Sequence, residues 1–362
     1  MNRLKVAIVH DYFVQCGGAE RVASALASLF PEAAVFSTVA LPDRLPPAMK
    51  NTKITTTWMQ NLPAMRRYYR HYFLLYPMAV EALNLDEFDL IISSSSGYAK
   101  GVKRNSRAIH ICYCHTPMRW VWNSASYLKS HEHNPLARRM LSVALGLLER
   151  WDRRAAQRPD YYIANSKAVA KRIETIYQRP AKVIPPPIDV DRFEPSLEDG
   201  GYYLILSRLV RYKRIDLAVS ACTQLGKKLV VVGEGPELPR LRAIAGPTVK
   251  FLQRQPDSVV NHHASRCKAL IFPGEEDFGM APLEVNAAGR PVIAFRAGGA
   301  LETVVEGETG LFFDEPTTMA LCQAICRFEQ QRWDSTAIRA HAMRFNGTVF
   351  ASRIRDFVAS VS

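Results

Sequence analysis

The sequence has no long uninterrupted apolar run. An apolar run at 5–9 is short and leads directly into His10 and Asp11, so we expect no secretory signal peptide. The longest apolar stretch in the middle of the chain, Leu141–Leu148, is far shorter than the roughly 20 residues that a membrane-spanning helix needs. We therefore expect a protein that is made in the cytoplasm and stays there.

Cysteines that could form a regular framework are also lacking. The seven cysteines are an odd number, and Cys112 and Cys114 have no second ligand pair at zinc-site spacing. The pattern favours reduced thiols in the protein core. Internal repeats and low-complexity segments are absent as well.

What is present is an ordinary globular composition with an uneven charge. The 362 residues are 48% hydrophobic and 22% charged, which is enough for two α/β domains with a core each. Residues 1–180 contain 25 Lys and Arg against 13 Asp and Glu, whereas residues 181–362 contain 22 against 21. This asymmetry indicates an anionic partner for the first half: nucleic acid, an acidic lipid surface or a phosphorylated substrate.

Strand-like and helix-like segments alternate along the chain, which predicts parallel sheets covered by helices on both faces. The prolines at 185–187 and the polar run 194–201 mark a domain boundary, because proline lacks a donor and cannot continue a sheet. Helices are expected at 19–30, at 138–157 and throughout 317–361. Strands are expected at 4–10, 35–39, 89–95, 108–115, 161–165, 202–208, 228–233, 249–252, 268–272, 291–295 and 310–313.

The segment 65–78 combines basic and aromatic residues. As one helix it would place Arg66, Arg67, Arg70 and His71 on one side, and its aromatic residues on the other. Such a helix is typical of proteins that bind an anionic membrane interface. An ordinary surface helix with its aromatic side in the core is the alternative.

The stretch 272–284 carries the most informative chemistry. Glu276 and Glu284 flank a Phe-Gly turn that follows a buried strand and opens a helix. Backbone N–H groups at a helix N-terminus can bind a diphosphate. One carboxylate could then reach a reacting sugar attached to that diphosphate, and the other could accept hydrogen bonds from a ribose diol. Taken alone, an acidic loop before a helix would explain both glutamates equally well.

Three further strand ends carry compatible residues. Arg208 and Lys213 follow the strand at 202–208 and can neutralise a departing diphosphate. Glycines at 233 and 235, and again at 298 and 299, let a ligand approach the backbone. We expect these strand ends to meet at one edge of a single sheet.

These elements together resemble the retaining glycosyltransferases of family four, which have the GT-B fold. The resemblance covers nearly the whole chain: Gly-Gly-Ala-Glu-Arg at 17–21, Arg-Leu-x3-Lys at 208–213, Gly-Glu-Gly-Pro-Glu at 233–237, Glu-x7-Glu at 276–284 and Gly-Gly-Ala-Leu-Glu-Thr at 298–303. It implies two doubly wound Rossmann-like domains facing across a cleft. These would be an acceptor-binding domain at 1–185 and a nucleotide-sugar-binding domain at 186–344, with a C-terminal helix at 345–362 packing back on the first.

The resemblance also implies roles for single residues. In the second domain, Arg208 and Lys213 would bind the leaving diphosphate, Glu276 would meet the donor sugar, and Glu284 the ribose. Residues that would complete the donor site are Gly17, Gly18, Gly233, Glu237, Phe278, Gly279 and Met280.

In the first domain, His115 resembles the family's histidine close to the transferred sugar, so we expect it to join Arg208, Lys213 and Glu276 in catalysis. Trp120, Trp122 and Tyr127 could stack on sugar faces of the acceptor, although core packing competes with that interpretation. Asn123 departs from the family, in which an acidic residue follows the second tryptophan.

We expect no cofactor and no metal. Asp189 and Asp191 form an Asp-x-Asp, but relatives carry aspartates at this place without metal. Cationic side chains and helix N-termini would stabilise the leaving group instead, and the acceptor would attack the same face of the sugar. A donor phosphate oxygen is the expected base, with a double displacement through Glu276 as the alternative.

The whole pattern predicts a glycosyltransferase of polysaccharide or lipopolysaccharide assembly, peripheral on the inner face of the cell membrane. GDP-mannose is the first choice of donor and a UDP-hexose the second, with a lipid-linked or glycan acceptor. Alternatives are another GT-B enzyme, such as a nucleotide-sugar epimerase or a phosphorylase, and a basic nucleic-acid-binding protein. No recognisable nucleic-acid-binding module is present, so we expect no nucleic-acid partner.

Overall fold

The computed structural model describes residues 4–123 and 135–361. Internal contacts divide the chain into two units. The N-terminal unit comprises Met1–Ile184 together with Arg355–Ser362, and the C-terminal unit comprises Pro185–Ile354. The division falls at the triple proline, one residue before the expected boundary.

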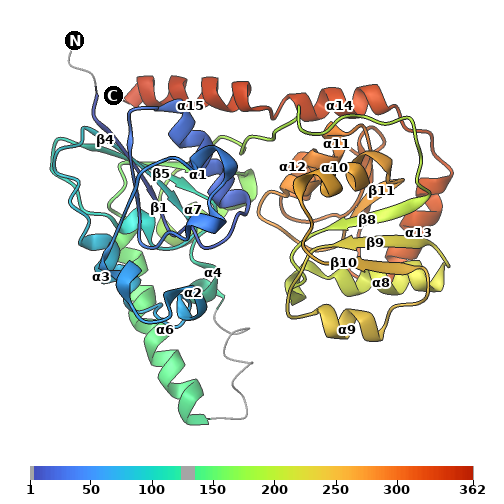
Figure 1. Ribbon diagram of the computed structural model, residues 1–362, viewed down its shortest axis with the longest axis horizontal. Coiled ribbons are helices and arrows are strands. Elements are labelled where there is room, and N and C mark those ends of the chain that lie inside the picture. Colours follow the sequence, from blue (N-terminus) through green and yellow to red (C-terminus); the bar gives the residue numbers. More distant parts are fainter. Residues whose placement is uncertain (1–3, 124–134, 362) are drawn as a thin grey trace. The chain divides into compact units, whose positions relative to one another are not determined.

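The N-terminal unit is built on one seven-stranded parallel sheet in the order β3-β2-β1-β4-β5-β6-β7 (Figure 1). Its central strand β1 is Val-Ala-Ile-Val-His, buried along its whole length, as expected for a parallel strand covered on both faces. The strands are β1 (Val6–His10), β2 (Ala34–Ser37), β3 (Ile54–Thr56), β4 (Leu90–Ser95), β5 (Ile109–Cys114), β6 (Tyr161–Ala164) and β7 (Lys182–Val183).

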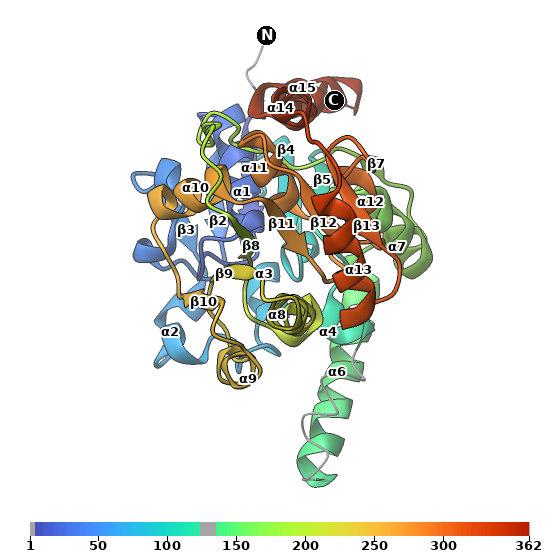
Figure 2. The same ribbon diagram turned by 90° about the vertical axis from the view of Figure 1, so that its right-hand side faces the viewer.

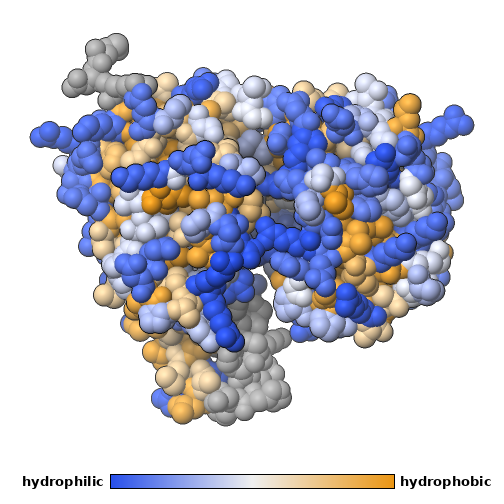
Figure 3. Space-filling model, viewed as in Figure 1, coloured by the Kyte–Doolittle hydropathy of each residue, from blue (hydrophilic) through white to orange (hydrophobic). Residues whose placement is uncertain are grey.

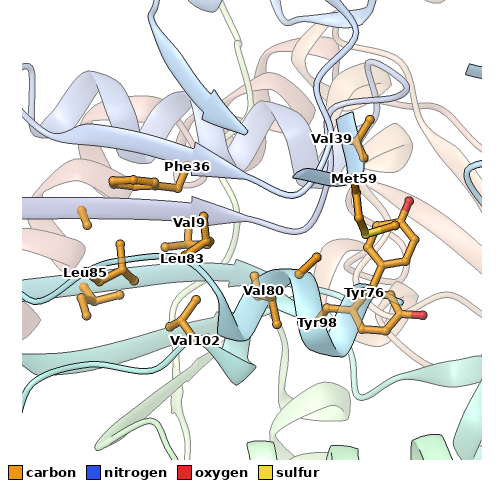
Figure 4. Close-up of a cluster of buried hydrophobic side chains, with 14 of the residues drawn as sticks. Val9, Phe36, Val39, Met59, Tyr76, Val80, Leu83, Leu85, Tyr98 and Val102 are labelled. Atoms are coloured by element: carbon orange, nitrogen blue, oxygen red, sulfur yellow. The ribbon is translucent and has the colours of Figure 1, made fainter. Parts of the chain in front are cut away.

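The core of this unit lies against β1 and β4 and continues under short helices and loops (Figure 4). Tyr76 and Tyr98 stack at 4.7 Å between ring centroids, next to Val39 and Met59. The helices are α1 (Gly18–Leu29), α2 (Met65–Tyr68), α3 (Tyr76–Glu81), α4 (Arg119–Trp122), α6 (Pro135–Ala155) and α7 (Lys167–Tyr177).

A buried ion pair fixes the second half of α6 to this core. Lys100 Nζ lies 2.5 Å from Asp152 Oδ1, and both side chains are almost fully inaccessible. Burial lowers the pKa of Lys100, but the neighbouring Asp152 carboxylate outweighs it, so the pKa is raised overall. Trp122 and Tyr177 donate to the other carboxylate oxygen, at 2.7 and 2.9 Å, which leaves the buried charge well compensated.

The C-terminal unit has a six-stranded parallel sheet in the order β10-β9-β8-β11-β12-β13 (Figure 2). The strands are β8 (Tyr202–Leu206), β9 (Lys228–Val232), β10 (Val249–Leu252), β11 (Ala269–Phe272), β12 (Val292–Phe295) and β13 (Gly310–Phe313). The helices are α8 (Ile215–Gln224), α9 (Leu238–Ala243), α10 (Asp257–Arg266), α11 (Met280–Ala287), α12 (Ala300–Thr303), α13 (Thr318–Glu329) and α14 (Ser335–Met343). The last helix, α15 (Gly347–Val361), begins in this unit, and its residues from Arg355 onward belong to the N-terminal unit. Two apolar clusters fill the core of the C-terminal unit.

Every strand predicted from the sequence is present, and so are the predicted helices at the N-terminus, in the middle and at the C-terminus. Two strands were missed. β3 is only partly buried and β7 is two residues long, so neither produces the continuous apolar run that marks a central strand.

The prediction of one amphipathic helix at 65–78 is wrong. The segment forms α2, a run of turns and α3, with Pro77 in the first turn of α3. Met65 and Tyr76 are buried, and Tyr69, Tyr72 and Phe73 pack partly against the same core. The aromatic side of this segment is therefore core.

The expectation of core thiols is confirmed for Cys112, Cys114, Cys222 and Cys267, which are free and buried. It is wrong for Cys326, which is exposed on α13. None of the helices in the described ranges has the length and apolar character to cross a bilayer.

Candidate functional site

The carboxyl ends of β8 and β11 form the centre of the candidate site in the C-terminal unit. These strands are neighbours, but the chain leaves β8 toward β9 on one side and continues from β11 to β12 on the other. This is the switch point of a doubly wound sheet, where the loops diverge and leave space for a ligand. A crevice there is lined by Ser207, Lys213, Gly274 and Glu276, among other residues.

Close contacts between backbones bring the predicted strand ends together. Gly233 has a positive φ of 144°, and a Cβ there would overlap the carbonyl oxygen of Ser207. Gly299 lies so close to Phe278 that a Cβ would overlap its backbone, and its N–H donates to the carbonyl of Glu276 at 2.8 Å. Glycine is therefore required at both places by the close approach of neighbouring loops.

Lys213 and Glu276 meet across this switch point. Lys213 Nζ forms an ion pair with Glu276 Oε1, and the two side chains are 13% and 20% exposed. Arg208 differs, because its side chain is exposed and forms no ion pair with any residue of the described ranges. The arrangement presents one free guanidinium and one ammonium that a carboxylate holds in position.

The loop after β11 ends at the N-terminus of α11. Gly279, with a φ of 88°, is the N-cap of this helix, and no side chain caps it. Within the described ranges, the N–H groups of Phe278, Gly279 and Met280 form no hydrogen bond, so they remain available to an anion. Glu284 is half-buried one turn inside α11.

Glu237 lies beside the end of β9. It is the N-cap of α9, its backbone N–H donates to the carbonyl of Leu209 at 3.0 Å, and its carboxylate pairs with Arg240 at 2.9 Å. The β8 and β9 loops are thus tied together beside Arg208.

Asp11 organises the corresponding switch point of the N-terminal unit, between β1 and β4. It directly follows β1 and is 3% exposed. Its carboxylate accepts from the backbone N–H groups of Ser96, Tyr98 and Ala99 at 2.6–2.8 Å. Because every one of these donors belongs to the loop after β4, a single side chain fixes the shape of that loop.

His10, Ser94 and His115 form a buried chain of hydrogen bonds next to Asp11. His10 Nδ1 lies 3.1 Å from the Ser94 carbonyl oxygen and 3.0 Å from Ser94 Oγ. A carbonyl only accepts, so Nδ1 of His10 carries the proton. Among the described residues, Nε2 of His115, 2.8 Å away, is then the acceptor left for the Ser94 hydroxyl hydrogen.

This partner pattern assigns the proton of neutral His115 to Nδ1. Burial, and to a smaller extent the neighbouring His10, lowers the pKa of His115 to about 3. His115 is therefore neutral near pH 7 and offers an Nδ1–H that can donate to a ligand. It is poorly suited to act as a base, because its other ring nitrogen is occupied by Ser94.

Gly17 and Gly18 lie at the start of α1. The Gly17 N–H donates to Glu20 Oε2 at 2.9 Å, and a Cβ on Gly17 would lie 2.9 Å from the same oxygen. Burial raises the pKa of Glu20. The two glycines thus form a tight helix start in the N-terminal unit. Their role toward the donor stays a prediction.

Trp120 and Trp122 are both partly buried. Trp120 packs at 6.0 Å from the ring of Tyr98, and Trp122 donates to Asp152 while Arg153 lies 4.5 Å from its ring. Trp122 thus links α4 to α6, whereas Trp120 packs α4 against the loop after β4. The role of both side chains toward an acceptor stays a prediction. Tyr127 lies outside the described residues.

The predicted Asp-x-Asp does not form a cluster. Asp189 and Asp191 are both exposed, and residues 4–123 and 135–361 contain no group of three or more histidine, cysteine or acidic side chains that could hold a metal ion.

The sequence interpretation missed Asp11, Ser94 and His10. The available signal was their position: each lies at the carboxyl end of β1 or β4, the two strands that flank the switch point.

Two family models match the chain. The model described as "Glycosyltransferase Family 4" matches residues 16–192, and the model described as "Glycosyl transferases group 1" matches residues 188–348. Together they match residues 16–348, which contain every strand of both sheets except β1.

Curated relatives and solved structures agree with these matches. A GDP-mannose-dependent alpha-(1-6)-phosphatidylinositol monomannoside mannosyltransferase of Mycolicibacterium smegmatis is 31% identical over 39% of this chain and 45% of its own length. A D-inositol 3-phosphate glycosyltransferase of Acidothermus cellulolyticus is 29% identical over 52% of this chain and 50% of its own. The chain thus spans about half the length of these curated relatives.

In fold, the chain resembles HepE of Anabaena, solved in complex with UDP and glucose, with a TM-score of 0.68 and 18% identity over 99% of this chain and 100% of that one. It also resembles sucrose-phosphate synthase of Thermosynechococcus elongatus, with a TM-score of 0.73 and 18% identity over 99% of both chains. Two parallel-sheet α/β units, the two matched models and these structural neighbours identify the chain as a member of the GT-B glycosyltransferases with family 4 and group 1 domains.

Proposed function

We propose that this protein is a retaining glycosyltransferase that moves mannose from GDP-mannose onto a lipid-linked or polysaccharide acceptor in cell-envelope glycan synthesis. The observation that carries the proposal is the switch point of the C-terminal unit. There Arg208, the Lys213–Glu276 pair and the uncapped start of α11 surround the carboxyl ends of β8 and β11. Fixed positive groups and aligned amides are what a departing diphosphate requires.

In the proposed reaction the nucleoside diphosphate leaves with its charge held by Arg208, Lys213 and the amides of 278–280. The acceptor hydroxyl attacks the same face of the sugar, and a donor phosphate oxygen takes its proton. Glu276 competes with the phosphates for Lys213 until the donor binds and then faces the sugar. His115, as a neutral Nδ1–H donor, would hydrogen-bond a sugar hydroxyl.

The names of two relatives favour GDP-mannose over a UDP-hexose as the donor. The matched M. smegmatis protein and a Mycobacterium tuberculosis protein, 29% identical over 48% of this chain, are both named as GDP-mannose-dependent mannosyltransferases. A UDP-hexose is the second candidate, because HepE was solved with UDP.

The uneven charge of the sequence supports the proposed acceptor and location. A lipid-diphosphate-linked acceptor at the inner face of the cell membrane would place anionic groups against residues 1–180, in which basic residues outnumber acidic ones 25 to 13. The protein would then be a peripheral membrane enzyme.

The test is a panel of nucleotide sugars without added metal, read as donor hydrolysis and as transfer to a membrane-lipid extract. We expect turnover with GDP-mannose and, in calorimetry, binding of GDP more tightly than of UDP. Turnover with UDP-hexoses alone would show that the donor is a UDP-hexose and not GDP-mannose. Absence of binding to every nucleoside diphosphate would refute the proposal and favour the nucleic-acid-binding alternative. A phosphorylase or an epimerase would be recognised by consumption of phosphate or by isomerised donor.

A further inference from the structure

A row of large apolar side chains lies exposed along the first part of α6. Leu136, Met140, Val143 and Leu147 are 70, 66, 60 and 54% exposed. Their spacing of four, three and four residues places them on one side of the helix. Figure 3 shows a column of apolar side chains over α6, the helix at the lower left of Figure 1.

The protein core does not use this side of α6. The buried residues of the helix are Leu145, Leu148, Asp152 and Ala155, which point in a different direction from the row. All of them lie at or after position 145, and in Figures 1 and 2 the first half of α6 extends away from the sheet of its own unit. Four exposed aliphatic side chains in one row are unusual for a surface that faces only water.

Arginines continue and flank the row. Arg150 and Arg154 extend it by the same three-four spacing, and Arg139 lies beside its beginning, whereas Arg138 lies on the opposite side of the helix. All four are exposed and form no ion pair with any residue in the described ranges. The sequence has no acidic residue between 135 and 148.

The acidic groups of α6 do not cancel this charge. Asp152 is buried against Lys100, and Glu149 is paired with Arg153 at 3.0 Å. The exposed face therefore combines an apolar row with uncompensated positive charge, which is the composition of helices that lie in the interface of an anionic bilayer. A nucleic acid would match the arginines but leave the aliphatic row in water.

We propose that this surface of α6, the row Leu136, Met140, Val143 and Leu147 with Arg150 and Arg154, docks the protein onto an anionic lipid bilayer. The proposal rests on the proposed function in one respect, the membrane location. The apolar side chains enter the boundary between headgroups and acyl chains, and the arginines contact lipid phosphates. The segment 65–78, whose aromatic side is core, is not needed for this contact.

The test is co-sedimentation of the full chain with vesicles of phosphatidylglycerol and phosphatidylcholine in equal amounts, against vesicles of phosphatidylcholine alone. We expect binding to the anionic vesicles that weakens with salt. The variant L136S/M140S/V143S/L147S should bind at least about tenfold more weakly. R150Q/R154Q should bind about 30-fold more weakly and depend less on salt, since each arginine near an anionic surface contributes about 1 kcal/mol.

A matched control replaces four exposed apolar residues of the C-terminal unit, as L197S/I244S/M319S/M343S. It should bind vesicles like the unchanged protein. Because the α6 positions are exposed, the thermal transition of the row variant should also stay unchanged, which separates docking from misfolding. A Met140→Trp variant should show additional quenching by brominated lipids, whereas Met319→Trp should not.

Equal vesicle binding by the row variant and the unchanged protein would overturn the proposal. So would a vesicle-free dimer that the row variant abolishes, since the row would then bind a second copy of the chain. GDP calorimetry without vesicles keeps the two proposals distinguishable. If the protein binds GDP but not vesicles, only the docking proposal fails. If it binds vesicles but no nucleotide, the proposal of a transferase fails.

Discussion

The two units share a sheet topology but differ in how they use the polar groups at their switch points. In the N-terminal unit, Asp11, Ser94 and His115 are buried and bonded to one another or to the backbone. In the C-terminal unit, Arg208 is exposed, and the Lys213–Glu276 pair is partly accessible. The first arrangement has fixed its polar groups internally, whereas the second leaves charge and amides for a ligand. Stability should therefore depend on the first switch point and anion binding on the second.

Lowering the pH should have the largest effect, a loss of stability in the N-terminal unit. Burial lowers the pKa of both His110 and His115 to about 3, whereas the unfolded value is near 6.5. Their neutral forms stabilise the fold above pH 6.5, and this stabilisation is lost as the pH falls toward 3. Between pH 6 and pH 4 we expect the two histidines to remove roughly 5 kcal/mol of unfolding free energy.

Urea unfolding followed by tryptophan fluorescence measures this loss, because Trp58, Trp120, Trp122 and Trp151 belong to the N-terminal unit and only Trp333 to the other. The variant H110Q/H115Q should flatten the pH dependence, and His71→Gln, at an exposed position, should leave it unchanged. A pH dependence that both variants share with the unchanged protein would contradict the assignment.

Removing the free guanidinium should have the next largest effect. Arg208→Ala is expected to lower kcat/KM for sugar transfer by about 10²- to 10³-fold, since it removes a group that stabilises the leaving charge. Its thermal transition should not move, because the side chain is exposed. Arg242→Ala, an exposed arginine on α9, is the control. Turnover of Arg208→Ala within about threefold of the unchanged protein would eliminate the role.

Removing the buried carboxylate of Asp11 should lower the stability of the fold, which Arg208→Ala should leave unchanged. Asp11→Ala leaves three backbone N–H groups without their acceptor and should lower the unfolding free energy of the N-terminal unit by about 3 kcal/mol. Asp86→Ala, at an exposed position, should stay within about 0.5 kcal/mol. The same fluorescence assay decides, and equal stability of the two variants would show that the loop after β4 does not depend on Asp11.

The smallest effect is expected at Glu276. Glu276→Gln removes a carboxylate that competes with phosphates for Lys213, so GDP should bind about three- to tenfold more tightly. Sugar transfer should nevertheless fall, because the group that faces the sugar has changed. Calorimetry with GDP and the transfer assay measure the two halves of the prediction, with Glu308→Gln as an exposed control. Weaker GDP binding would mean that Glu276 positions Lys213 rather than competing for it.

The sequence was most informative where a feature is local. β11 is Ala-Leu-Ile-Phe and fully buried, so the strand and the charged loop after it could be predicted from a continuous apolar run. The meeting of the four strand ends in the C-terminal unit followed from the geometry of parallel sheets. The hydrogen bonds of Asp11 could not be predicted, because its partners lie 85 to 88 residues away.

Helical periodicity was the least informative signal. It identified α6 within three residues at its start but could not tell which side of the helix faces the core. At 65–78 the same signal gave a helix that the structure lacks, because turns connect α2 and α3 and the aromatic residues pack inward. Helical periodicity shows that a segment has an apolar side, but it does not show what packs against that side.

The last helix, α15, limits how the chain can be divided into fragments that fold. Residues Arg355–Ser362 at the end of α15 belong to the N-terminal unit, where Phe357 packs edge-on against Tyr161 at 6.1 Å. A fragment that stops at Ile184 would therefore lose part of its own fold and leave Tyr161 without this neighbour. An independently expressed first half would have to carry the final residues as a tethered peptide or receive them in trans, which makes split-protein complementation a natural experiment for this chain.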